Sequence, residues 1–215
     1  MTEMKSFVAG ALAIASVTAV LKDLLGNGLV AYCEAAGLGD ITVSAMPPDR
    51  LTTGAEERNQ LNLFLYRVAP HVSFAKPAGQ GPSPSNSAFP GRALSLELSY
   101  LLTACGTEDL QAEMLLGCAI QLFHYTPVLS PERIRAALGS APPRRAKQML
   151  TPVNAALTKS GLADQVKQIK ISAQFLDFDA MSKLWSAFQA RYRPSVVYQV
   201  SAVVLDASSG RTEAA

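Results

Sequence analysis

The stretch LSLELSYLLTACG, from Leu94 to Gly106, decides the fold that this chain is expected to adopt. Apolar and polar side chains alternate along it, and successive side chains of a β-strand point to opposite faces of a sheet. The predicted apolar face holds Leu94, Leu96, Leu98, Tyr100 and Leu102, and the predicted polar face holds Ser95, Glu97, Ser99 and Thr103. We therefore predict a strand with one side packed in a hydrophobic core.

A second alternating stretch lies upstream, from Leu61 to Val68. Residues 73–93 separate the two predicted strands and are rich in proline, glycine and serine. Connections of this length inside a compact domain are uncommon and are usually functional or disordered. We expect the two strands to pair as an antiparallel hairpin that carries residues 73–93 as a long arm at its tip. In the upstream strand we expect one face to hold Leu61, Leu63 and Leu65, and the other Asn62, Phe64 and Tyr66.

The N-terminal region favours a long helix over about residues 7 to 36, with a break near Gly26 and Gly28. The apolar run that follows Lys5 also has features of a signal peptide. The helix is favoured because the run continues directly into charged residues and because apolar side chains recur at helical spacing. That stripe consists of Ile14, Val17, Leu21, Leu24 and Leu25.

The middle of the chain predicts a short strand with Ile41, Val43 and Ala45 on one face, ended by Pro47-Pro48. After residue 106 we expect a helix from Thr107 or Glu108 through about His124, and a short helix that Ser130 caps and that ends near Gly139. A further helical stretch is expected from about residue 146 to 158. The core face of the helix through His124 is expected to hold Leu110, Met114, Cys118 and Leu122, broadened by Leu115, Ala119 and Phe123.

The C-terminal third predicts a half-buried strand, a helix capped by Asp177, and a last strand from Val196 to Leu205. The buried positions are expected at Ile169, Ile171, Ala173 and Phe175 of the strand and at Met181, Leu184, Trp185 and Phe188 of the helix. This order of elements lacks strict β–α alternation, so we predict one α+β domain over residues 1–207 with a largely antiparallel or mixed sheet and helices packed on it. Residues 208–215 are expected to form a polar tail.

Composition argues for a protein that works through its surfaces. Hydrophobic residues make up 49% of the chain and charged residues 17%, which is apolar for a soluble monomer of this size. The formal net charge of +2 is too small to indicate nucleic-acid binding. No segment is expected to insert into a membrane, and we expect a protein of cytoplasmic origin. The three cysteines are expected to be buried free thiols: Cys33, Cys105 and Cys118.

No catalytic, cofactor or metal site can be assembled from the sequence, and we expect no enzyme and no cofactor. The two histidines, His71 and His124, lack the cysteine partners of a zinc site. The stretch Gly79–Gly81 precedes no helix that could receive a phosphate. The adjacent Glu56 and Glu57 are expected in a solvated loop, and Trp185 is expected to pack in the core.

A basic cluster surrounds Pro142-Pro143 and leaves two interpretations open. It is either a solvated face or an electropositive patch that steers an acidic partner surface into register. Its members are Arg133, Arg135, Arg144, Arg145 and Lys147.

Seven stretches of the chain, taken in order, carry a family resemblance: LAIASVTAVLKDLL (12–25), NLFLYRVAPH (62–71), LSLELSYLLTACG (94–106), EMLLGCAIQLFH (113–124), PVLSPERIRAAL (127–138), MSKLWSAF (181–188) and YRPSVVYQVSAVVL (192–205). Together they resemble the cap, or tail-terminator, proteins of extracellular contractile injection systems. These are phage-tail-like particles of the antifeeding-prophage and Photorhabdus virulence-cassette type. Each stretch is a packing pattern, so the order and spacing carry the resemblance, and residues 73–93 and 139–165 match it least.

The resemblance implies a structural protein that forms a homo-hexameric ring at the baseplate-distal end of the particle. Such a ring stops tube and sheath growth and holds the last sheath layer. The implied partners are further copies of the chain and the inner tube and sheath proteins, joined after assembly in the cytoplasm. Two other functions stay open, namely another structural subunit such as a baseplate or adaptor protein, and a small-molecule-binding or enzymatic α+β domain.

An open sheath end leaves strand edges unpaired, and a cap can satisfy them with strands of its own. We expect such contacts from the 73–93 arm and the C-terminal tail. The candidate partner-contacting residues are Lys76, Pro82, Phe89, Arg92, Arg133, Arg144 and Arg145.

Overall fold

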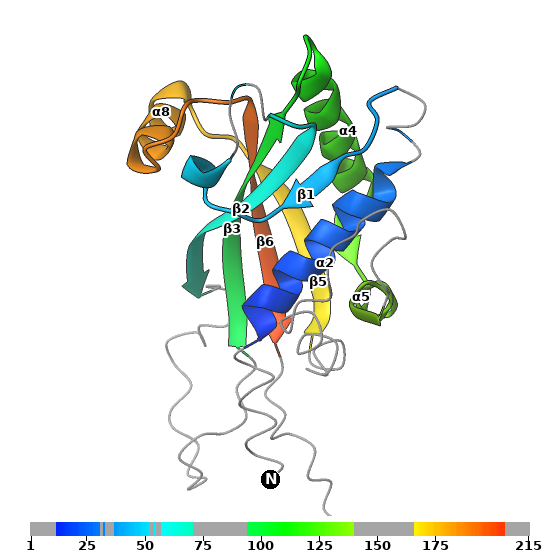
Figure 1. Ribbon diagram of the computed structural model, residues 1–215. Helices are drawn as coiled ribbons and strands as arrows, with labels where there is room; N and C mark the ends of the chain where they lie inside the picture. Colours follow the sequence, from blue (N-terminus) through cyan, green and yellow to red (C-terminus); the bar gives the residue numbers. More distant parts are fainter. Residues whose placement is uncertain are drawn as a thin grey trace, which may run out of the picture.

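A computed structural model of the chain describes residues 12–30, 32, 37–51, 54, 57–70, 94–139 and 166–204 (Figure 1). The elements in chain order are α2 (Ala13–Gly28), β1 (Thr42–Ser44), the 3-10 helix η1 (Pro48–Arg50), β2 (Gln60–Pro70), β3 (Leu94–Cys105), α4 (Gln111–Tyr125), β4 (Val128–Leu129), α5 (Pro131–Gly139), β5 (Val166–Gln174), α8 (Phe178–Ala187) and β6 (Ser195–Val204).

The described strands form one six-stranded sheet in the order β1-β2-β3-β6-β5-β4. The predicted hairpin lies within it: β2 and β3 pair antiparallel from Gln60 opposite Cys105 to Pro70 opposite Leu96, with a bulge between Leu65 and Arg67. β6 pairs antiparallel with both β3 and β5, and β1 runs parallel to β2. The predicted α+β fold with a largely antiparallel, mixed sheet is confirmed.

One face of the sheet carries the main core and is covered by α2, α4 and α5 (Figure 1). The predicted apolar faces of β2 and β3 point into it, because Leu61, Leu63, Leu98 and Leu102 are fully buried there. Burying a leucine side chain stabilises a fold by about 1.5–3 kcal/mol, so this alternation largely determines which face of the sheet is inside. Tyr100 reaches across to α2, where its hydroxyl and that of Thr18 share a hydrogen bond of 2.8 Å.

The break predicted near Gly26 and Gly28 coincides with the end of α2, although residues 1–11 lie outside the described part. A Cβ atom at Gly28 would lie 2.7 Å from Cδ2 of Leu122. Gly28 therefore lets α2 and α4 pack closely at this point.

The buried side of α4 differs from the prediction. Its core contacts come from Leu115, Ala119 and Phe123, which are buried, with Cys118 and Leu122 only half-buried beside them. The predicted core positions Leu110 and Met114 are instead exposed. Both faces of this helix are rich in apolar residues, so the pattern alone did not identify the face that meets the sheet.

The C-terminal elements follow the prediction closely, with two corrections. Oδ1 of Asp177 accepts a 2.7 Å hydrogen bond from the Ala180 amide and caps α8, and Trp185 is buried. β5 ends at Gln174, and Phe175, which was expected to be buried, is 95% exposed. Ala173 is exposed as well. The helix expected over residues 146–158 lies outside the described residues.

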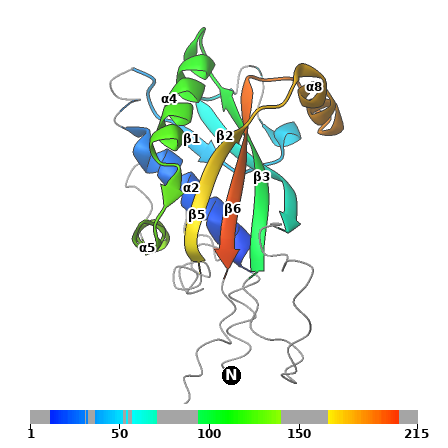
Figure 2. The same ribbon diagram turned by 180° about the vertical axis from the view of Figure 1, so that it is seen from behind.

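Among the described elements, α8 covers the opposite face of the sheet, and it does so at one end (Figure 2). Leu101, Val197 and Trp185 form a small second core there, and Phe64 packs edge-on against Phe188 with ring centroids 5.3 Å apart. The predicted outward side of β2 therefore contributes to this second core.

Candidate assembly surfaces

Within the described ranges, no group of three His, Cys, Asp or Glu side chains lies close enough together to hold a metal ion. His124 is exposed near the C-terminal end of α4, whereas His71 and the stretch Gly79–Gly81 lie outside those ranges. Trp185 packs in the second core, and its Nε1 donates a 3.3 Å hydrogen bond to the Ser195 hydroxyl. No helix of this part of the chain is long and apolar enough to cross a membrane.

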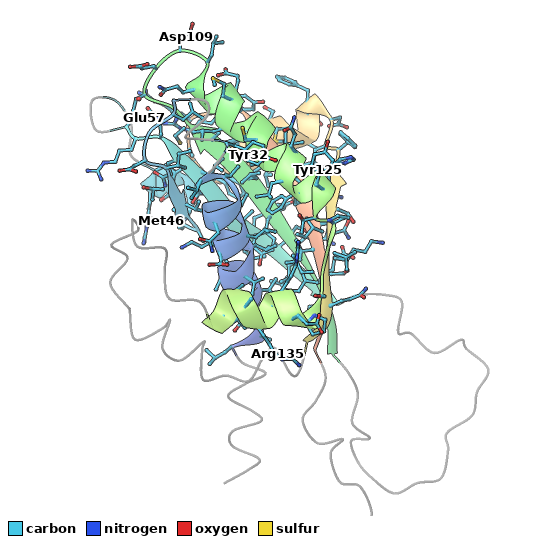
Figure 3. All side chains as sticks on the ribbon, turned by 90° about the vertical axis from the view of Figure 1, so that its right-hand side faces the viewer. Tyr32, Met46, Glu57, Asp109, Tyr125 and Arg135 are labelled. Atoms are coloured by element: carbon cyan, nitrogen blue, oxygen red, sulfur yellow. The ribbon has the colours of Figure 1, made fainter. Side chains whose placement is uncertain are left out.

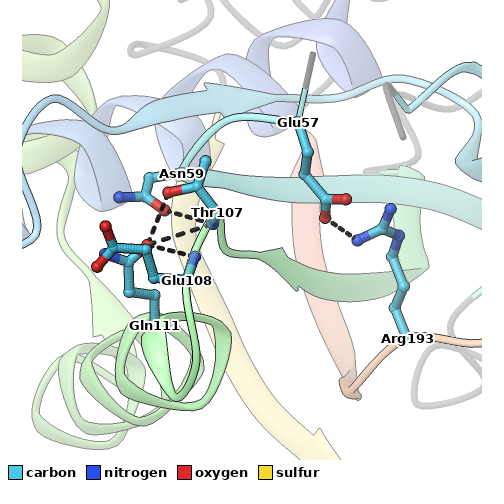
Figure 4. Close-up of polar contacts among 6 residues, drawn as sticks. All are labelled: Glu57, Asn59, Thr107, Glu108, Gln111 and Arg193. Atoms are coloured by element: carbon cyan, nitrogen blue, oxygen red, sulfur yellow. Dashed lines mark hydrogen bonds and ion pairs between the residues drawn. The ribbon is translucent and has the colours of Figure 1, made fainter. Parts of the chain in front are cut away.

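Glu57 is held in place, contrary to the prediction of a solvated loop. Its carboxylate pairs with the guanidinium of Arg193, and both side chains are largely buried (Figure 4). The hydrogen bond to Glu57 raises the pKa of Arg193. Glu57 and Arg193 are 136 positions apart in the sequence. The sequence alone therefore gives no sign that the fold places them side by side. Glu56 lies outside the described residues.

Cys105 ends β3 close to this ion pair and is buried, as predicted. Burial raises the pKa of its thiol, and the nearby Arg193 offsets part of that rise. A thiol with a raised pKa stays protonated near neutral pH and is a poor nucleophile. Cys118 is half-buried on α4, and Cys33 lies outside the described residues.

The start of α4 is fixed by a hydrogen-bond network rather than by a capping side chain at its first position (Figure 4). Oε1 of Gln111 accepts hydrogen bonds from the Thr107 amide at 3.2 Å, the Thr107 hydroxyl at 2.9 Å and the Glu108 amide at 3.1 Å. Oδ1 of Asn59 accepts a second 3.2 Å bond from the Thr107 amide. The network ties the turn after β3 to β2 and sets the direction in which α4 leaves the sheet.

Leu110 stands at the N-cap of α4 in a left-handed conformation, with φ 64°. A left-handed backbone costs a non-glycine residue about 1–2 kcal/mol. The conformation turns an apolar side chain outward, and Leu110 is 62% exposed. Both features are unfavourable for the isolated chain.

The outward side of α4 carries several apolar residues beside the exposed polar side chains of Glu113, Gln121 and His124. Met114, Gly117 and Ile120 follow Leu110 at helical spacing and are all exposed. Gly117 lies mid-helix, where glycine costs about 1 kcal/mol relative to alanine. A Cβ atom there would meet nothing within 4 Å among the described residues, so packing among them does not require glycine. We call the surface formed by Leu110, Met114, Gly117 and Ile120 the α4 shelf.

A second apolar surface lies on the flank of α8. A hollow of about 310 Å³ opens there, lined by Phe178, Ser182, Trp185, Ser186, Ala190 and Tyr192. Phe178 is 82% exposed, and the Trp185 and Tyr192 rings lie 5.7 Å apart. Phe178 lies two helical turns before Trp185 and therefore on the same side of α8. Phe178 is exposed, whereas Trp185 is buried in the second core. We call this surface the α8 hollow.

Away from α8, the strands on that face carry mainly polar side chains within the described part of the chain, and of these Ser99 is buried. The registers place one row of side chains across four neighbouring strands, formed by Arg67, Ser99, Gln199 and Ser172. The next row includes Glu97, Ser201 and Lys170. Antiparallel sheets commonly present such a face to solvent or to a polar partner.

Of the predicted partner-contacting residues, only Arg133 falls within the described part. It lies exposed in the first turn of α5, where its amide is 3.5 Å from the Ser130 hydroxyl that caps the helix. The remaining six lie outside the described residues: Lys76, Pro82, Phe89, Arg92, Arg144 and Arg145.

The α4 shelf and the α8 hollow were missed by sequence reasoning. Their aromatic and aliphatic residues have the spacing of core positions in a helix. Whether such a residue is buried depends on whether the sheet lies opposite it, which the spacing does not reveal. One available signal was Gly117, a glycine in the middle of a predicted helix with no turn nearby.

Comparison with known proteins gives a family and a related fold. Residues 16–215 match the family described as Pvc16 N-terminal domain. The chain is also similar to the sheath/tube terminator of the extracellular contractile injection system PVC in its extended state, with 14% sequence identity and a TM-score of 0.53. That match covers 89% of this chain and 56% of the terminator chain. No curated protein is similar enough to count as a match.

A second solved structure, the tube-terminating cap of the anti-feeding prophage, matches 80% of this chain and 52% of its own, with 14% identity. Its TM-score of 0.35 is too low to carry an argument. The first match supports the fold, and the family match spans most of the sequence, as the resemblance of the seven stretches implied. The chain belongs to the Pvc16 N-terminal domain family.

Proposed function

We propose that this chain is a structural terminator, which ends the tube and the sheath at the baseplate-distal end of a contractile injection particle. The observation that carries the proposal is the family match over residues 16–215. The likeness in fold to a chain described as a sheath/tube terminator supports it. Since this chain spans 56% of that terminator, the proposal concerns the part of the protein that shares this fold.

The sheet edges leave room for a strand from another subunit. The outer strands are β1 with three residues and β4 with two. β1 pairs with β2 only at residues 60–62, and β4 pairs with β5 only at Ile169 and Lys170. Among the described strands, the rest of β2 has no second neighbour, and an unpaired strand edge can accept a strand of a partner.

The finer parts of the proposal are a hexameric ring of this chain and anchoring of the last sheath layer. A closed ring needs two different surfaces on each subunit, because each copy contacts one neighbour through one patch and the other neighbour through another. The α4 shelf and the α8 hollow supply two separate apolar surfaces. The polar sheet face, with Arg67, Glu97 and Lys170, is available for contacts with tube or sheath.

Locating the chain in the particle tests the proposal against the alternative of a baseplate or adaptor subunit. A gold label on an affinity tag fused to the chain is expected at the end opposite the baseplate in electron micrographs. Label at the baseplate, or along the whole sheath, would contradict a terminator. Particles without the tag are the control for non-specific gold.

A further inference from the structure

We propose that the chain binds the open end of the particle through one end of its sheet, and that the surface it meets there is an acidic protein surface. This end of the sheet is formed by Pro70, Leu94, Val166 and Val204, and we call it the Val204 end. The inference rests on the proposed function and adds the orientation of the chain and the chemistry of its partner.

Four strands begin or end together at the Val204 end. Val204 lies opposite both Leu94 and Val166, and Pro70 lies opposite Leu96. The start of α2 and the whole of α5 lie at the same end in the front and side views (Figures 1 and 3). The four longest stretches outside the described ranges therefore all connect to this end, namely residues 1–11, 71–93, 140–165 and 205–215.

The opposite end of the sheet has short connections. There β3 leads into α4 through residues 106–110 and β5 leads into α8 through residues 175–177, and the structure describes both. Long connections in a compact domain are uncommon and are usually functional or disordered. Binding residues are also concentrated in segments that a rigid scaffold holds. About a third of the chain is attached at the Val204 end, which makes this end the best suited to a large partner.

Positive charge is concentrated in the segments that attach at the Val204 end. Residues 71–93 and 140–165 hold six basic residues and one acidic residue: Lys76, Arg92, Arg144, Arg145, Lys147 and Lys159, against Asp164. Residues 1–11 and 205–215 change this balance little, with two basic and three acidic residues. The whole chain has a formal net charge of +2, so the rest of it is net negative.

The described residues show the same polarity. Three exposed basic side chains at the Val204 end stand against two acidic ones: Arg133, Arg135 and Lys170 against Glu97 and Glu132. At the opposite end, α4 begins beside the exposed Glu108, Asp109 and Glu113, which the exposed Arg58 and Arg191 there do not outweigh. The side view shows Arg135 and Asp109 at opposite ends of the molecule (Figure 3).

This distribution of charge favours one kind of partner and one orientation. Opposite charges on two proteins steer their encounter and fix the register in which they bind, whereas like charges oppose binding. The Val204 end of a second copy carries the same excess of positive charge and is therefore disfavoured as the partner. An acidic surface at the open end of the tube and sheath is favoured, and the start of α4 then faces away from the particle.

The first test reverses two charges at one end of the full chain. Arg133→Glu with Lys170→Glu is compared with Arg58→Glu with Arg191→Glu, which changes the net charge equally at the opposite end, and all four side chains are exposed. Particles from cells that lack the chain are mixed with each labelled protein and pelleted, and circular dichroism checks the fold. We expect the first double variant to bind about tenfold more weakly or less, and the second to bind like the unmodified chain. Binding of the unmodified chain is expected to fall as salt is added.

The second test reads the orientation directly and changes one residue at a time. Asp109→Cys and Arg133→Cys each place a thiol at an exposed position, one at each end of the molecule. A maleimide carrying a polyethylene glycol chain is expected to modify both variants in free solution. In the particle, Asp109→Cys is expected to react as before and Arg133→Cys to be protected. The unmodified chain gives the background from its own thiols.

The proposal is overturned if both double variants bind alike, or if Arg133→Cys stays reactive in the particle while Asp109→Cys is protected. Binding that is lost when the particles are treated with nuclease would identify a nucleic acid as the partner and overturn it as well. These outcomes are independent of the gold-label position. Label at the distal end with the opposite protection pattern rejects the orientation and keeps the terminator, and the expected protection with label at the baseplate does the reverse.

Discussion

The Glu57 carboxylate and the Arg193 guanidinium form an ion pair that joins the segment before β2 to the segment before β6, two strands separated in the sheet by β3. Their charges influence Cys105 at the end of β3, so the pair lies across the strand between them. The pair connects the ends of β2, β3 and β6 at the end of the sheet where α4 begins.

Removing one charge of this pair is expected to destabilise the fold. Glu57→Gln leaves the largely buried guanidinium of Arg193 without its carboxylate, and hydrogen bonds to charged groups contribute about 1.5–3 kcal/mol. We expect a decrease of about that size in the free energy of unfolding, measured by urea denaturation. The matched control is Lys183→Ala, which removes the exposed pair with Asp179 and should cost less than about 0.5 kcal/mol. Equal effects of the two substitutions would show that Glu57 and Arg193 do not act as a clamp.

The buried tyrosines predict a loss of stability at alkaline pH. Burial raises the pKa of Tyr198 from 10.0 to about 12, so the neutral phenol is favoured in the folded chain. A raised folded-state pKa contributes stability that is fully present below pH 10.0 and is lost as the pH rises to about 12. We expect the free energy of unfolding to fall across this window, and Tyr198→Phe to make the fall smaller. The exposed Tyr125→Phe is the control, and a Tyr198→Phe chain with an unchanged pH slope would contradict the assignment.

Two glycines near α4 are expected to respond in opposite ways to alanine. Gly117→Ala meets no atom within 4 Å and should raise the free energy of unfolding by up to about 1 kcal/mol through helix propensity. Gly106→Ala would place its Cβ 2.6 Å from the Ala112 backbone nitrogen, and overpacking of this kind costs about 1–3 kcal/mol. Thermal unfolding of the two variants measures the contrast. A Gly117→Ala chain that is less stable than the unmodified one would mean that the chain itself needs this glycine.

The strands and their faces could be predicted because alternation records which side of a sheet is buried. Leu98 and Leu102 could be assigned to the core because every second residue of a strand points to the same face of the sheet. Asp177 at the start of α8 and Pro131 at the start of α5 are local signals, and both were placed correctly because helix caps depend on few neighbours.

The surfaces could not be predicted because exposure depends on distant parts of the chain. Leu110 has the spacing of a core residue and is turned outward by a left-handed backbone that the pattern does not reveal. Phe175 alternates correctly with its neighbours but follows the last strand residue. Glu57 appeared solvated because its partner, Arg193, is brought to it only by the pairing of β6 with β3.

The central claim is that this chain ends the tube and sheath, and the length distribution of particles tests it most directly. Electron micrographs of particles from cells that lack the chain should show tubes and sheaths of uncontrolled length or no closed particles, and the unmodified chain supplied in trans should restore one uniform length. Particles of unchanged, uniform length in the absence of the chain would contradict a terminator.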